Sequence, residues 1–262
     1  MGGKIRWIQW ITFIGVLLII ELLPRVGLVR PASLVPTSEI LMRMGEVILT
    51  GAIPSPYFER AGIPTLSVHL SATMLGIFAS FMSAVLIGTL VGIIFWRVPL
   101  LWSVFNPFIV VYYALPIFAL YPLLVLLLGI GLAPIVMIGF LFAVVVVIAN
   151  TSLGLKRVDQ EIYPKVGQSL GLSPLQMYVW IYLPAAAPYV FTGWKLAFVY
   201  STIAVVASEF LISTRGLGHI IDRAYKNFET ANMYAMIALV MGIAIMAHFI
   251  LSRIERGLYA KA

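Results

Sequence analysis

Cysteine is absent from this chain, and charged residues are scarce. Without cysteine among its 262 residues, disulfides, thiol catalysis and thiolate metal sites are excluded. Charged residues make up 10% of the chain and hydrophobic residues 62%, against about 25% and about 45–50% in soluble domains. No Asp, Glu, Lys or Arg occurs between residues 98 and 155. Uncharged runs of this length predict an all-α integral membrane protein.

The positive net charge does not indicate a nucleic-acid partner. The formal charge is +7, but the Lys and Arg residues are scattered between apolar blocks and form no basic run. Such scatter is typical of a charge bias between the two faces of a membrane. Glycine-rich nucleotide loops, paired catalytic carboxylates and Ser/His arrangements are also missing. We therefore expect a chain that is not an enzyme and that binds no cofactor or metal itself.

Six membrane spans are expected, because about 20 apolar residues cross a hydrocarbon core. Pro107, Pro116 and Pro122 fall in the third span and predict a kinked or broken helix that lines protein or a water-filled cavity. Gly88 and Gly92 in the second span predict close helix packing. The chain is expected to form one transmembrane domain, 1–262, with approximate spans 7–23, 70–95, 101–128, 133–152, 188–212 and 231–252.

Positive residues in the short loops and tails determine the expected orientation. Arg215, Arg223 and Lys226 lie on one face, and a larger set shares the face of both termini. Because positive residues concentrate in the cytoplasm, we expect cytoplasmic termini, a cytoplasmic loop 153–187 and an external loop 25–68. The larger set is Lys4, Arg6, Arg97, Lys156, Arg157, Lys165, Arg253, Arg256 and Lys261.

Helix-start and helix-end residues in the expected cytoplasmic loop predict two short helices joined by a bend. Asp159 suits the N-cap of the first helix, and Gly171 suits a left-handed position after its end. Ser173 and Pro174 suit the N-cap and first position of the second, and the residue before Pro184 is expected to leave helical geometry. The apolar content fits either a docking site or an interfacial elbow packed on its own bundle. It comprises Leu170, Leu172, Met177, Val179, Trp180 and Ile181.

Five motifs occur in a characteristic order. They are YALPIFALYPLLVLLLGIG (113–131), NTSLGLKRVDQ (150–160), SLGLSP (169–174), YLPAAAPYVFTGWKLA (182–197) and SEFLISTRGLG (208–218). This order resembles the permease subunits of bacterial ATP-binding cassette importers, in particular the branch that carries sulfonates, taurine and nitrate. The resemblance runs from about residue 70 to the C-terminus. It implies the type I permease fold and a multi-pass protein of the bacterial inner membrane.

The resemblance also implies partners for the chain. They are a second permease subunit, identical or different, two cytoplasmic ATPases that bind ATP and Mg²⁺, and an external solute-binding protein. The segment around Gly171 would be the EAA loop, which contacts the ATPase. Lys165, Val166 and Gly167 stand where the family has Glu-Ala-Ala, so either the ATPase surface compensates the charge or the second permease keeps the acidic form. The implied coupling residues are Lys165, Gly167, Leu170, Gly171, Leu172, Ser173, Pro174, Met177 and Pro184.

Glu209 is the leading candidate for the translocation path. An ionisable group near the outer end of the fifth span is costly, and it fits either a gate or a structural lock paired with Arg215 or a backbone donor. Ser213 and Arg215, in the turn that follows the span, are also candidates for the path or gate. Tyr112, Tyr113 and Pro116 are further path candidates, although aromatic residues at helical spacing more often pack. The histidines His69, His219 and His248 are dispersed along the chain without metal-ligand spacing.

The solute class follows from the resemblance only. A small organic anion such as a sulfonate or taurine, or nitrate, is favoured, and a vitamin or pyrimidine precursor is the alternative. A membrane-embedded lipid-modifying enzyme would need a metal-binding cluster near the cytoplasmic interface, where Asp159 and Glu161 are the nearby acidic pair. A secondary transporter would need inverted repeats and intramembrane ion ligands, which the sequence does not display.

Overall fold

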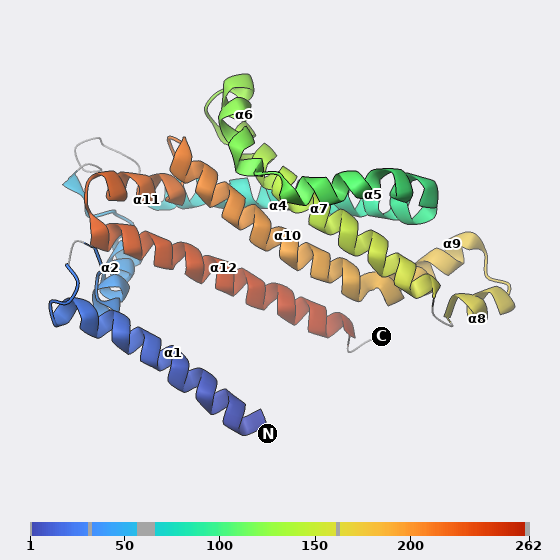
Figure 1. Cartoon of the computed structure of the whole chain (residues 1–262), viewed down its shortest axis with the longest axis horizontal. Helices are drawn as coiled ribbons and strands as arrows, with labels where there is room; N and C mark the ends of the chain where they lie inside the picture. The colour runs from blue at the N-terminus through green and yellow to red at the C-terminus, as the bar shows by residue number, and fades with distance from the viewer. Residues whose placement is uncertain (1, 31–32, 57–65, 161–162, 260–262) are drawn as a thin grey trace. The chain divides into compact units, whose positions relative to one another are not determined.

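The computed structural model describes residues 2–30, 33–56, 66–160 and 163–259, and the regular elements in these ranges are helical (Figure 1). The predicted all-α class is confirmed. The side chains of Lys4, Arg6, Glu161 and Lys261, used in the sequence arguments, lie outside the described residues. The elements are α1 (Gly2–Arg25), α2 (Thr37–Thr50), α4 (Leu66–Arg97), α5 (Pro99–Ala114), η1 (Ile117–Leu120), α6 (Tyr121–Leu128), α7 (Leu132–Asp159), α8 (Tyr163–Ser169), α9 (Pro174–Met177), η2 (Tyr178–Tyr182), α10 (Leu183–Leu211), α11 (Leu217–Lys226) and α12 (Thr230–Tyr259).

Five helical stretches in the described ranges are long and apolar enough to cross a membrane, and a bent pair is a sixth candidate. The bent pair consists of Pro99–Ala114 and Ile117–Leu128, which meet at 84° in the region of the predicted third span (Figure 1). The break falls at Pro116, and Leu115 before it is extended, as expected for a residue that precedes proline. The five stretches are Trp7–Arg25, Leu66–Arg97, Leu132–Asp159, Pro174–Leu211 and Thr230–Gly257.

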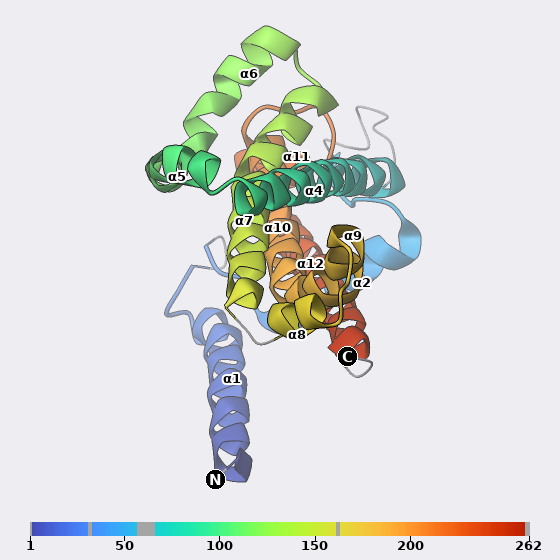
Figure 2. The same cartoon turned by 90° about the vertical axis from the view of Figure 1, so that its right-hand side faces the viewer.

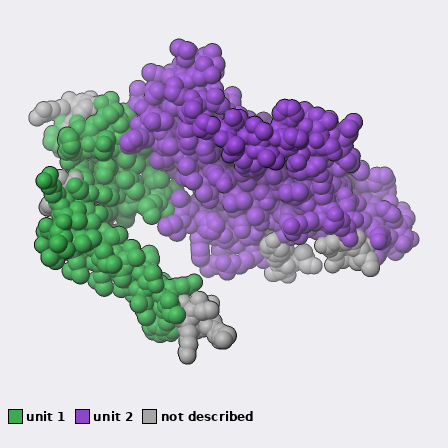
Figure 3. Space-filling model, in the orientation of Figure 1, with its two compact units in different colours: residues 1–72, 215–243 green, residues 73–214, 244–262 purple. Residues whose placement is uncertain are grey.

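The chain forms two compact units, which are coloured separately in Figure 3. Unit 1 comprises residues 1–72 and 215–243, and unit 2 comprises residues 73–214 and 244–262. Because α4 and α12 each contribute to both units, the units do not follow one another along the chain.

Close packing of α4 and α7 forms part of the core of unit 2. A Cβ atom at Gly88 would lie 2.7 Å from Val147 Cβ, and one at Gly92 would lie 2.7 Å from Thr151 Cβ. The four-residue spacing of these glycines therefore lets the two helices approach closely, as predicted. Helix α7 also packs along α10, and the two lie side by side in Figures 1 and 2.

Unit 1 contains a buried polar network between the chain before α4 and the start of α12. The Ser55 hydroxyl donates to Glu229 Oε1 at 2.6 Å. The Asn232 side-chain amide donates to Glu229 Oε2 at 2.9 Å and to the Pro54 carbonyl at 3.0 Å. Glu229 therefore ties segments about 175 residues apart in sequence, and such charge-assisted bonds are stronger than neutral ones.

Candidate functional site

The bend predicted at Gly171 has the geometry of a Schellman helix end. Gly171 has a φ of 69°, and its N–H donates to the Gln168 carbonyl at 3.0 Å. The Leu172 N–H donates to the Gly167 carbonyl at 3.2 Å. These two bonds satisfy carbonyls that the end of α8 would otherwise leave free. The left-handed conformation predicted for Gly171 is confirmed.

The second short helix begins as the sequence predicts. Ser173 is the N-cap of α9, Pro174 lies in its first turn, and Ser173 and Gln176 form a reciprocal capping box. The Ser173 N–H donates to Gln176 Oε1 at 2.8 Å, and the Gln176 N–H donates to Ser173 Oγ at 3.4 Å. This box fixes the direction in which the chain leaves the bend. Figures 1 and 2 show α8 and α9 folded next to one another beyond the end of α7.

The prediction that the residue before Pro184 leaves helical geometry is wrong. Leu183 has φ −63° and ψ −49°, and the backbone runs from α9 through η2 into α10. The Leu183 N–H donates to the Tyr178 carbonyl five residues back, which is a π-helical bond. Pro184 directly follows this π turn, in the first turn of α10.

The prediction that Asp159 caps the first short helix is also wrong. Asp159 is the last residue of α7, and it accepts a hydrogen bond from Trp96 Nε1 at 2.5 Å. The Trp96 ring lies 4.8 Å from that of Tyr182 and 6.2 Å from that of Tyr178. The end of α4 is therefore bound both to α7 and to η2. The sequence gives no local signal for this cluster, because its members are far apart along the chain.

Gly167 explains how the two arms of the bend pack together. A Cβ atom there would overlap the ends of the Met177 and Ile181 side chains, which would have to move to accept any larger residue. Met177 is buried. By contrast, Leu170, Leu175 and Trp180 are 72%, 73% and 62% exposed, which leaves an apolar surface on the outside of the bend.

The remaining predicted coupling residues lie around this surface. Lys165 is exposed on α8, and its carbonyl accepts from the Ser169 hydroxyl at 3.0 Å. Leu172 is half-buried at the bend, and Pro184 is exposed. The structure therefore brings the predicted coupling residues other than Pro184 into one helix–bend–helix, which we call the coupling bend (residues 163–182), and Pro184 follows in α10.

Glu209 is buried in unit 2 together with Thr73 of α4. The exposed fractions of the two residues are 2% and 1%. The Thr73 hydroxyl lies 2.9 Å from Glu209 Oε1 and 2.8 Å from Oε2. Near the same end of α10, the Tyr121 hydroxyl donates to the Ile212 carbonyl at 2.8 Å. A charge-assisted bond from a neighbouring helix thus holds the carboxylate, and sequence reasoning missed Thr73 and Tyr121 because their partners are distant in the chain.

The path candidates Tyr112, Tyr113 and Pro116 lie at or next to the break between α5 and η1. The Tyr112 hydroxyl donates to the Leu141 carbonyl at 2.7 Å, so this half-buried residue packs α5 on α7. Tyr113 is exposed, and Pro116 lies at the break before η1. Ser213 is half-buried in unit 2, whereas Arg215 is exposed in unit 1.

Two of the three histidines, described above as dispersed, form a pair in unit 1. The rings of His69 and His219 are stacked with 6.0 Å between centroids and 4° between planes, and both are buried. His69 Nδ1 accepts from the Gly216 N–H at 3.2 Å, which ties the start of α4 to the start of α11. Within the described parts of the chain, no three His, Cys, Asp or Glu side chains lie close enough together to hold a metal ion.

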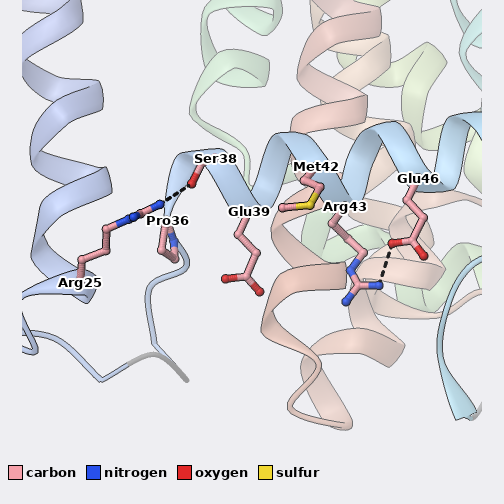
Figure 4. A pocket seen from close by; sticks show the side chains of 7 residues that line it. All are labelled: Arg25, Pro36, Ser38, Glu39, Met42, Arg43 and Glu46. Atoms are coloured by element: carbon pink, nitrogen blue, oxygen red, sulfur yellow. Dashed lines mark hydrogen bonds and ion pairs between the residues drawn. The ribbon is translucent and has the colours of Figure 1, made fainter.

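A groove lies between the end of α1 and α2 in unit 1 (Figure 4), with a volume of about 520 Å³. Of the residues that line it, Arg43 pairs with Glu46 at 2.9 Å, and Arg25 pairs at 2.7 Å with Glu21, which lies outside the lining. Glu21 also accepts from the Ser38 N–H and hydroxyl at 2.9 and 2.8 Å. The bonds from Ser38 to Glu21 therefore hold the start of α2 on the end of α1.

The family of the chain follows from sequence comparison. Residues 84–258 match the family described as binding-protein-dependent transport system inner membrane component. The chain belongs to this family. It is 31% identical to the taurine transport system permease protein TauC of Escherichia coli over 231 residues, which are 88% of this chain and 81% of that protein. It is 29% identical to the nitrate import permease protein NrtB of Synechocystis, over 67% of this chain and 64% of that protein.

The fold of this permease also occurs in a solved transporter. A chain of the MetNI methionine ABC transporter, described in inward-facing conformations, has a TM-score of 0.63 and 17% sequence identity, and the match covers 71% of this chain and 93% of that one. The family is non-catalytic. Membership in it replaces the two rival interpretations, the lipid-modifying enzyme and the secondary transporter.

Proposed function

We propose that this permease forms half of the solute path of an ATP-binding cassette importer and that its coupling bend binds a cytoplasmic ATPase. In the bacterial inner membrane, the termini and loop 153–187 would be cytoplasmic. A second permease, identical or different, would complete the path. Two ATPases would supply ATP and Mg²⁺ binding, and an external solute-binding protein would deliver the solute.

The apolar surface of the coupling bend is the observation that carries this proposal. Leu170, Leu175 and Trp180 are exposed on a segment whose backbone is fixed by a Schellman end and a capping box. A rigid element that presents large apolar side chains is suited to dock in a cleft of a partner protein. The positive residues Lys156, Arg157 and Lys165 near the bend support a cytoplasmic location.

A small organic anion, such as a sulfonate or taurine, or nitrate, is the proposed solute. The names of the relatives TauC and NrtB support this class. A vitamin or pyrimidine precursor is the second candidate. Uptake by the complete transporter, measured with labelled taurine, nitrate and a pyrimidine precursor in turn, would distinguish them.

Co-purification tests the proposed ATPase contact. The parent permease, expressed with its importer partners and solubilised in mild detergent, should carry an ATPase subunit through size-exclusion chromatography. Leu175→Asp should remove that subunit, since it places a charge on the exposed apolar surface. Leu49→Asp on α2 is the matched control, because Leu49 is 88% exposed and lies outside both the bend and the stretches that could cross a membrane. Isolation of a parent permease that transports without an ATPase would overturn the proposal.

A further inference from the structure

Consecutive residues of α10 contact different helices of unit 2 at one level. A Cβ atom at Gly193 would lie 2.8 Å from Asn150 Cβ, so α10 approaches α7 closely there. The next residue, Trp194, donates from Nε1 to Thr89 Oγ1 of α4 at 3.1 Å. Contacts with two helices are therefore made within one turn of α10.

The third residue at this level, Lys195, forms an ion pair with α12. Lys195 Nζ lies 2.6 Å from Glu255 Oε2, and the side chains are 19% and 13% exposed. Both residues lie in helical stretches that are candidates to span the membrane. An ionisable group in such a helix is costly and marks a functional position by default. Replacing only one of the two residues by a neutral one would leave the charge of the other without a partner in a poorly solvated site.

Helix α10 connects this level directly to the coupling bend. The backbone continues without a break from α9 through η2 to α10, and both Tyr182 and Leu183 are helical. Lys195 follows Leu183 by twelve residues, which is about 18 Å along a helix. A displacement of the bend therefore reaches Lys195 along one continuous helix.

We propose that Lys195 and Glu255 are positioning residues for transport, because their ion pair makes α12 follow α10 when the coupling bend is displaced. The contacts of Gly193 and Trp194 carry α7 and α4 in the same movement. Neither member of the ion pair acts on the solute. The inference rests on the proposed function, since it takes the coupling bend as the place where the ATPase acts.

The ratio of solute transported to ATP hydrolysed tests the proposal in the complete reconstituted transporter. Lys195→Met and Glu255→Gln should each lower this ratio by at least about fivefold, the lower end of typical coupling between sites, while the ATPase stays bound. The exchanged variant Lys195→Glu with Glu255→Lys should restore most of the ratio. Lys226→Met is the matched control, because Lys226 pairs with Asp222 on the surface of α11. An unchanged ratio in both single variants would overturn the proposal.

Two further measurements separate coupling from folding. If a single variant fails to fold, and the exchanged variant folds but keeps a low ratio, the ion pair is structural and the proposal is wrong. A Lys195→Cys and Glu255→Cys variant can be joined by a short bifunctional thiol reagent, since the chain has no other cysteine. The joined variant should still transport, and arrest by the link would contradict a common movement of α10 and α12. Absence of an ATPase from the parent complex would instead count against the proposed function.

Discussion

The Thr73 hydroxyl lies within 2.9 Å of both carboxylate oxygens of Glu209, and both residues are almost completely buried. A hydroxyl has one hydrogen to donate, so the two oxygens share it. The contact connects α4 to α10 near the C-terminal end of α10, where the sequence predicts a gate or a lock. The two roles differ in what the loss of the negative charge does.

For Glu209→Gln we expect a folded and assembled subunit with reduced transport, or with reduced stimulation of ATP hydrolysis by the loaded binding protein. The amide keeps the shape of the side chain and one oxygen that can accept from Thr73, while the negative charge and one acceptor oxygen are lost. Uptake and ATPase assays on the reconstituted complex measure this effect. Thr73→Val is the companion variant and should lower the free energy of unfolding by about 1–3 kcal/mol, because it leaves a buried carboxylate without this donor. If Glu209→Gln abolishes the folded subunit, Glu209 is a lock.

Phe228 offers a test of backbone strain at the end of α11. Its φ is 58°, and the Glu229 N–H donates to the Ala224 carbonyl at 2.8 Å, so Phe228 occupies the position that glycine usually takes in a Schellman end. Its side chain is 87% exposed and contributes little buried area. Phe228→Gly should therefore raise the free energy of unfolding by about 1 kcal/mol, measured by thermal unfolding in detergent. Phe228→Val should lower it, and a lower stability for the glycine variant would show that the aromatic ring is needed.

The helix ends of the coupling bend could be predicted because their causes are local. Gly171 adopts positive φ without penalty, Ser173 can cap a helix through its hydroxyl, and Pro174 has the φ of a first helical turn. The structure has all three as expected. The break at Pro116 has the same origin. The continuation of the helix through Pro184 could not be predicted, because it depends on a π turn over Tyr178–Tyr182 that no local sequence signal marks.

Pairing between distant residues was the part that the sequence could not supply. Lys195 carried a signal, since it is a charge inside a long apolar run, but its partner Glu255 is 60 residues away. The stacking of His69 on His219 depends in the same way on how α4 and α11 pack. Such pairs follow from tertiary packing, which local preference does not determine.

The orientation of the chain can be measured with single cysteines, since none occurs naturally. Gln168→Cys on the coupling bend should react with an impermeant thiol reagent only after the cytoplasmic face is opened. Lys226→Cys, at the end of α11, should react from outside in intact cells. Both positions are exposed, so burial does not limit the reaction. The reverse pattern would contradict the orientation predicted from the positive residues.

Gly171→Val tests whether the coupling bend transmits ATP hydrolysis to transport. A Cβ atom at Gly171 would meet nothing within 4 Å, so the effect of valine is confined to the backbone conformation. A β-branched residue at φ 69° costs about 1–2 kcal/mol, which is small beside the stability expected of a bundle of several long helices. The variant should therefore insert and fold, but it should misplace the apolar surface of the bend. We expect weaker ATPase association, or hydrolysis that no longer responds to the loaded binding protein.

Gly171→Asn is the matched control, because asparagine tolerates the left-handed conformation and should retain most of the coupling. Gly167→Leu differs from both, since its side chain would collide with Met177 and Ile181 and should separate the two arms of the bend. Gly167→Leu and Gly171→Val should therefore each lose more coupling than Gly171→Asn. Should Gly171→Val bind the ATPase and transport like the parent, the bend would be an interfacial elbow that packs on its own bundle, and the coupling role would have to lie elsewhere in the cytoplasmic loop.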